Sequence, residues 1–310
     1  MDKVTANKMK TSVSFQSWPA SSSYPTVDRL PVYFSSAMVA DGESFSPSAA
    51  KPASAVESWR LLGIPMTVIE PLPVTRDDLV RVHEPAYVDG VLSGRIRNGF
   101  GNKSASVAAS LPFTCGAMLC AAREALRNGC VAVAPCSGFH HASYEHGAGF
   151  CTFNGLMVAE MILHASGEAN RIGILDSDYH YGDGTDRIIS RLRIDWITHY
   201  SAGKTYSSAD DAAPFLSAIP HIIETMRDCD VILYQAGADP HIDDPLGGFL
   251  TSEQLFERDR RMFQSAHVLG VPIAWNLAGG YQSPLPKVLD IHDNTLKACG
   301  AEYLSRGDSD

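Results

Sequence analysis

Four short apolar runs, each followed at once by a polar segment containing glycine, restrict the possible folds of this chain more than any other feature. They cover residues 131–134, 172–175, 231–234 and 271–275. Short runs of this kind are typical of strands buried on both faces of a parallel sheet. Residues 31–34, 66–69 and 196–199 indicate further strands.

Stretches with a helical pattern separate these runs. Residues 105–128 are rich in alanine, with Leu and Met at helical spacing. Thr251 and Gln254 form a possible capping box at the start of another stretch. The alternation predicts an α/β fold, a single domain with a central parallel sheet flanked by helices. The expected helices are 105–128, 156–165, 215–227, 251–268 and 285–304.

Length and composition fit one large domain with a sizeable core. The chain has 310 residues, of which 45% are hydrophobic. Residues 1–30 are rich in Ser, Thr and Pro and are interpreted as a partly disordered N-terminal extension, with the folded domain at 31–310.

The net charge of −10 argues against a nucleic-acid surface. Scattered cysteines without a CxxC pair indicate reduced thiols and a cytoplasmic protein, and the lack of 18 consecutive apolar residues predicts no membrane span.

Polar segments that follow neighbouring parallel strands can share one site. In open α/β sheets a ligand binds at the carboxyl ends of the strands. The four segments therefore are expected to converge there. They cover residues 136–142, 176–185, 235–245 and 276–282.

The segment 176–185 has the side chains of a metal site. On an extended chain Asp176, Asp178 and His180 would share one side. Asp178 and His180 with one further carboxylate, Asp243 or Asp244, would leave an open position, which is the catalytic arrangement for zinc. The alternative is that these aspartates only cap the next helix.

The other segments offer proton-transfer groups and an oxyanion donor. The adjacent His140 and His141 suit general acid–base work near neutral pH, and Asp176 and Asp183 are free to orient them. Gly279 lets the backbone approach a ligand closely and, with the next glycine, places the Tyr281 hydroxyl where it could donate to an oxyanion.

Phe150 could form the wall of a narrow apolar channel, because it follows glycines 147 and 149 in a tight loop. Each of these residues also has a purely structural interpretation. A buried histidine is often a core residue, and Phe150 and Tyr281 could pack in the core.

In order along the chain, the motifs GFHHA, GFCTFN, DSDYHYGDGT, GADPHIDDPLGG and AGGY resemble those of the histone deacetylase superfamily, the zinc-dependent branch of the arginase/deacetylase fold. The likeness covers about residues 31–304 and is nearest to class IV and bacterial class II-like members. It implies an eight-stranded parallel sheet in a deacetylase-like catalytic domain. It also implies one zinc ion, with iron(II) as an alternative, held by Asp178, His180 and Asp244.

The resemblance further implies roles for the residues around the metal. His140 and His141 would be the tandem proton-transfer histidines, paired with Asp176 and Asp183 respectively, and Tyr281 would polarise the carbonyl. The substrate would meet the walls Phe150 and Tyr206, the carbonyl of Gly149, and Gly279.

Two departures from the family pattern affect substrate and ion binding. No Asp or Glu lies between Ser93 and Ala121, so the usual aspartate that grips the substrate backbone is missing and Asn102 is the nearest polar candidate. A structural potassium would lack its usual serine near 196–199 but could use main-chain carbonyls.

These features predict a zinc-dependent amidohydrolase that removes an acetyl or longer acyl group from an acylated amine. The substrate would be an acyl-lysine peptide, an acetylated polyamine or a small amide, and the oligomeric state stays open. The alternatives are an arginase-type ureohydrolase, which would need two metal ions, and an inactive protein that binds acyl ligands.

Overall fold

The computed structural model describes residues 24–305, and strands and helices alternate along most of this range. Short 3-10 turns occur at Ser36–Met38, Ala202–Lys204 and Ala209–Asp211. The strands and helices are β1 (Leu30–Tyr33), α1 (Lys51–Leu61), β2 (Met66–Ile69), α2 (Arg76–Leu79), α3 (Pro85–Leu92), α4 (Ala105–Asn128), β3 (Val131–Ala134), α5 (Gly155–Ala165), β4 (Ile172–Asp176), α6 (Asp183–Leu192), β5 (Ile197–Ser201), α7 (Ala212–Glu224), β6 (Val231–Gly237), α8 (Ser252–Leu269), β7 (Ile273–Ala278) and α9 (Pro286–Tyr303).

The strands form one parallel sheet in the order β2-β1-β3-β7-β6-β4-β5. The predicted α/β fold is therefore confirmed. Among the described residues the sheet has seven strands rather than the expected eight. The central strands β3, β4, β6 and β7 are buried throughout, which explains why their sequences contain almost no polar residues before their final positions.

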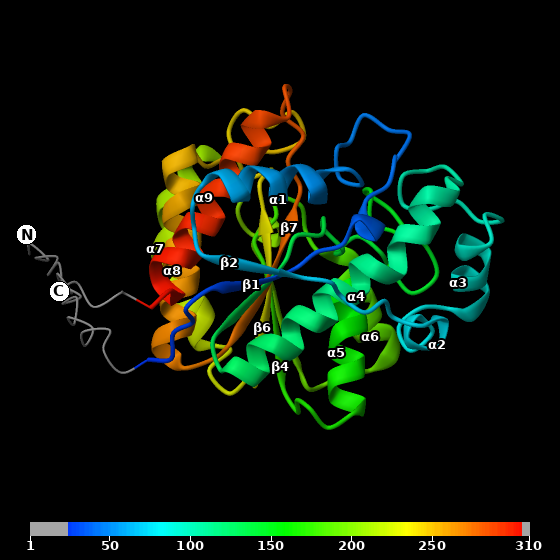
Figure 1. Cartoon of the computed structure of the whole chain (residues 1–310), viewed down its shortest axis with the longest axis horizontal. Helices are drawn as coiled ribbons and strands as arrows, with labels where there is room; N and C mark the ends of the chain where they lie inside the picture. Colours follow the sequence, from blue (N-terminus) through cyan, green and yellow to red (C-terminus); the bar gives the residue numbers. More distant parts are fainter. Residues whose placement is uncertain (1–23, 306–310) are drawn as a thin grey trace, which may run out of the picture.

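Helices cover both faces of the sheet (Figure 1). One apolar core holds residues of α1, α7, α8 and α9, and the other holds residues of α3, α4, α5 and α6. In the figure the two groups of helices lie on opposite sides of the strands. This arrangement leaves the carboxyl edge of the sheet to the loops.

Helix α4 is long and apolar enough to cross a membrane by length and composition alone. It instead packs on α5, β3 and β7, and 61% of its most apolar window is buried inside the domain. Its hydrophobicity is that of a core helix.

Most predicted elements occur within a few residues of their expected positions. The predicted helix 105–128 is confirmed, and so is the capping box in which Thr251 accepts from the backbone N–H of Gln254. Much of the expected extension 1–30 lies outside the described residues. Its final part packs on the domain, because Val27 pairs with Leu304 and β1 already starts at Leu30.

Candidate active site

The four polar segments follow β3, β7, β6 and β4, which are neighbours in the sheet. Because these strands are parallel, all four segments leave the same edge. The sheet therefore brings residues from widely separated parts of the chain to one place, as expected from the sequence.

A compact group of three side chains, named the acidic group here, could hold a metal ion. It consists of Asp178, His180 and Asp239. Among the described residues, one donor atom from each of these side chains lies within 4.8 Å of the others. His180 Nδ1 lies 2.8 Å from Asp239 Oδ2 and 3.2 Å from Asp178 Oδ1. Asp178 and Asp239 are both buried. Two buried carboxylates facing one imidazole nitrogen fit a bound cation.

Asp239 was not among the expected ligands, although it is the first carboxylate after β6. The ligand implied by the resemblance, Asp244, is buried beside the group. Its Oδ2 accepts from the Tyr281 backbone N–H at 2.7 Å, and its Oδ1 accepts from that of Leu246 at 3.0 Å. The other candidate, Asp243, is exposed.

The two histidines have the carboxylate partners that the resemblance implies. His140 Nδ1 lies 2.8 Å from Asp176 Oδ2, and His141 Nδ1 lies 2.9 Å from Asp183 Oδ1. The two imidazole rings are 4.1 Å apart between centroids. His140 Nε2 lies 3.7 Å from Asp178 Oδ1, so the pair adjoins the acidic group.

The carboxylates and histidines perturb one another's protonation. Burial and the negative charge of Asp178 raise the pKa of Asp239 to about 7. Burial lowers the pKa of His140, but the charges of Asp176 and Asp178 outweigh it and raise the value to about 9. Burial and the neighbouring His140 hold the pKa of His141 below its ordinary value. Such opposed shifts in adjacent groups are typical of acid–base sites.

Three aromatic rings surround Phe150. Its ring centroid lies 5.4 Å from that of Phe45, 5.5 Å from Tyr281 and 5.7 Å from Phe100. Phe150 has a φ of 65°, a left-handed conformation that a bulky residue rarely adopts. Sequence reasoning missed Phe45, which is 75% exposed although it contacts both Phe150 and Tyr281.

Gly149 and Gly279 occupy positions where no side chain would fit. A Cβ on Gly149 would lie 2.4 Å from the His141 ring, and one on Gly279 would overlap the carboxylate of Asp239. The Gly279 carbonyl accepts a hydrogen bond from Lys51 Nζ, a completely buried amine that sequence reasoning also missed.

Two expected substrate contacts are used elsewhere in the structure. Tyr206 packs on Phe215 at 5.0 Å between ring centroids, rather than among the rings around Phe150. The Asn102 amide donates to the Gly42 carbonyl and accepts from Asn98, so it ties two loops together. A single sequence could not show these partners, because they come from distant segments.

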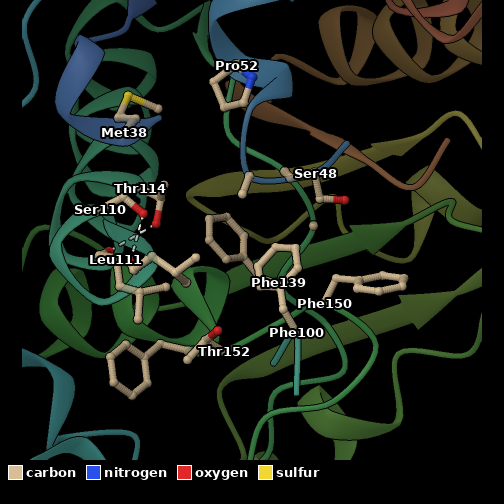
Figure 2. A pocket seen from close by; sticks show the side chains of 15 residues that line it. Met38, Ser48, Pro52, Phe100, Ser110, Leu111, Thr114, Phe139, Phe150 and Thr152 are labelled. Atoms are coloured by element: carbon tan, nitrogen blue, oxygen red, sulfur yellow. Dashed lines mark hydrogen bonds between the residues drawn. The ribbon is translucent and has the colours of Figure 1, made fainter. Parts of the chain in front are cut away.

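A small, mostly apolar cavity lies beside Phe139 and Phe150 (Figure 2). Phe139, which directly precedes His140, and Phe150 line it together with residues of α4. Figure 2 shows Ser110, Leu111 and Thr114 on that helix. The cavity therefore lies between α4 and the loops that carry Phe139 and Phe150.

Comparison with known proteins identifies the family. The sequence pattern of the histone deacetylase domain matches residues 48–206. An uncharacterized protein from Picosynechococcus sp. is 30% identical over 77% of this chain and 87% of its own length. The chain belongs to the histone deacetylase family. A probable deacetylase from Methanothermobacter thermautotrophicus is 28% identical over 69% of this chain and 73% of its own length.

Solved structures show the same histone deacetylase fold. The HDA15 HD domain matches with a TM-score of 0.72 at 18% identity, over 91% of both chains. An acetylpolyamine aminohydrolase from Burkholderia pseudomallei matches with a TM-score of 0.65 at 18% identity, over 88% of this chain and 99% of that one. The solved structures agree in fold, and the family match makes this chain a protein of the deacetylase type.

Proposed function

We propose that the protein hydrolyses the amide bond of an acylated amine in a metal-dependent reaction. The observation that carries the proposal is the histidine pair His140–His141, held by two carboxylates beside the group of Asp178, His180 and Asp239. We propose zinc as this metal, because zinc accepts both carboxylate and imidazole ligands and the family resemblance implies it.

Asp178 and His180 would hold the metal together with a carboxylate of the 239–244 segment. Asp239 is the candidate by proximity and Asp244 by resemblance. A bound metal ion would polarise the acyl carbonyl and acidify a water molecule. The buried, crowded carboxylates fit this role, because a nearby cation would offset the burial and the repulsion by Asp178 that together raise the pKa of Asp239.

The chain's own side chains would carry the protons. One histidine of the pair takes the proton of the attacking water, and a histidine of the pair later protonates the leaving amine. Asp176 and Asp183 hold each Nδ1 atom, which leaves each Nε2 atom for this exchange. The Tyr281 hydroxyl donates to the developing oxyanion.

The aromatic rings and the cavity favour an acyl group of modest size. The rings of Phe45, Phe150 and Tyr281 lie together at the site. Phe150 also lines the cavity, which has a volume of about 50 Å³. At 10–15 Å³ for each water-sized group, this is room for roughly four such groups. We propose that the acyl chain reaches this cavity past Phe150, so that acetyl and short acyl chains fit better than long ones.

A small acylated amine is favoured over a protein substrate by one observation. Asn102, the nearest polar candidate for gripping a peptide backbone, uses its amide to join two loops. An acetylated polyamine needs no such grip, and its cationic amine suits a chain with a net charge of −10.

Replacement of Tyr281 by phenylalanine tests the reaction. Tyr281→Phe should lower kcat about 10²–10³-fold, the usual loss when one oxyanion donor is removed. The measurement is a steady-state assay on an acetylated polyamine and an acetyl-lysine peptide with the metal at saturation. The matched control is Tyr206→Phe, which removes a hydroxyl from a ring packed on Phe215 and should keep wild-type kcat.

Near-normal turnover of Tyr281→Phe would refute the role of this hydroxyl. A wild-type protein that binds metal but cleaves none of these substrates would refute the proposed function.

A further inference from the structure

Arg258 on α8 is completely buried behind the two loops that carry the acidic group. Its Nη1 atom donates to the Gly237 carbonyl at 2.7 Å and lies 3.2 Å from the Ser177 carbonyl. Gly237 ends β6 shortly before Asp239, and Ser177 directly precedes Asp178. One guanidinium nitrogen therefore joins the backbones of both loops.

The guanidinium is itself held in one orientation. Arg258 Nε donates to Asp259 Oδ1 at 2.8 Å. Thr295 Oγ1 donates to Asp259 Oδ2 at 2.6 Å, and the Tyr234 hydroxyl donates to the same carboxylate. All four residues are buried. A buried ion pair with these additional hydrogen bonds has little freedom to move.

The two loops lie so close that a small shift matters. A Cβ on Gly237 would lie 2.5 Å from Asp178 Cα, so the backbone of β6 passes directly against Asp178. Any displacement of one loop relative to the other changes the distance between the Asp178 carboxylate and the candidate ligands of the 239–244 segment. Metal affinity depends strongly on such distances.

We propose that Arg258 is a positioning residue for the metal site, which it serves by fixing the relative position of the Asp178 and Asp239 loops through their carbonyl groups. The inference rests on the proposed metal-dependent function. Lysine cannot replace Arg258 in this role, because a single ammonium group lacks the planar guanidinium fork that reaches Asp259 and both carbonyl groups together.

The test is metal binding by Arg258→Lys in the full-length protein. The variant keeps the buried positive charge but loses the fork. The dissociation constant for Zn²⁺, measured by competition with a chelator, should rise about 10–100-fold, as is usual for partners that orient metal ligands. The visible absorption of bound Co²⁺ should also change, because it reports ligand geometry rather than stability.

Arg261→Lys is the matched control on the same helix. Arg261 Nη1 also donates to a carbonyl, that of Leu216 on α7, at 2.9 Å. This variant should bind both metals as the wild type does. A folded Arg258→Lys protein with wild-type Zn²⁺ affinity and an unchanged Co²⁺ spectrum would overturn the proposal.

If Arg258→Lys does not fold, Tyr234→Phe takes its place, because it removes one hydroxyl that holds Asp259. Tyr234→Phe should also raise the dissociation constant for Zn²⁺, and an unchanged affinity would again overturn the inference. The Zn²⁺ affinity and the Co²⁺ spectrum are both measured without catalysis. A wild type that binds metal but hydrolyses nothing would refute the proposed function and leave the positioning role to be decided by the binding data.

Discussion

Asp178 and Asp183 come from one short segment but contact different groups. Asp178 lies within the acidic group, whereas Asp183 contacts the His141 ring and Arg187. We propose that the segment has two separate tasks. One end would bind the metal, and the other would orient a proton-transfer group.

Replacing each aspartate separates these tasks. Asp178→Ala should remove bound metal, because it deletes a buried carboxylate of the group. Asp183→Asn should keep the metal but lower kcat about 10–100-fold, the usual effect of losing a partner that orients a catalytic or ligating side chain. Elemental analysis gives the metal per chain, and steady-state kinetics gives kcat. An Asp183→Asn protein that is folded but free of metal would contradict this division.

The limits of sequence reasoning at this scale come from tertiary partners. The sequence indicated four of these residues, because each lies in the polar segment after a recognisable strand: Asp178, His180, His140 and His141. Phe45 was not, because its polar, glycine-containing segment resembles an ordinary loop, and only the folded chain brings it to Phe150.

At the scale of elements, His83 joins two segments beside the site. Its Nδ1 bonds to the Ser143 carbonyl at 2.8 Å, and its Nε2 accepts from the Asn154 N–H at 2.9 Å. Asn154 caps α5, so the imidazole links the loop after the histidine pair to the start of that helix. Both bonds require a neutral ring with one proton, on Nδ1.

This arrangement predicts a loss of stability in mild acid. Burial lowers the pKa of His83 to about 4, whereas an unfolded chain has about 6.5. Below pH 6.5 the unfolded state therefore binds a proton at His83 that the native state does not bind. This difference should lower the free energy of unfolding by up to about 3 kcal/mol between pH 6.5 and pH 4.

Urea unfolding across this pH range provides the measurement, with His83→Gln as the comparison. The variant cannot titrate here, so its stability should fall less steeply with decreasing pH than that of the wild type. Parallel curves for the two proteins would contradict the assignment.

The elements themselves were largely predictable, with exceptions that have physical causes. The strands of the central sheet each begin with a short apolar run, and their positions follow directly from the sequence. Helix α1 went unrecognised because it lacks a clear amphipathic pattern and starts with Lys51-Pro52, both buried. The spacing of apolar residues along a segment predicts helices and strands, but it does not show where the chain turns towards the site.

At the scale of the whole molecule, the two ends of the described chain meet. Val27 N–H donates to the Tyr303 carbonyl at 2.9 Å, and the Val27 carbonyl accepts from the Ser305 N–H at 3.0 Å. The Pro25 carbonyl also bonds to His267 Nε2 at 2.8 Å. The segment 25–27, before β1, therefore connects α8 and α9 through these hydrogen bonds.

Comparing two shortened proteins tests this contact. A chain that begins at residue 30 should have a melting temperature several degrees lower than one that begins at residue 24, because it loses these backbone bonds and exposes His267 and Tyr303. Metal content should be the same in both, since the segment lies away from the acidic group. Equal melting temperatures would show that the segment adds no stability.

The place of β7 in the sheet has a consequence for how the two parts of the site are joined. Among the described residues this strand is the last along the chain, yet it lies between β3 and β6 and links the two halves β2-β1-β3 and β6-β4-β5. His140 and His141 follow a strand of the first half, and Asp178 and Asp239 follow strands of the second. A chain without β7 would lack the strand that joins the half carrying the histidines to the half carrying the carboxylates. Removal of this one strand should therefore separate the two sets of site residues, although it deletes none of them.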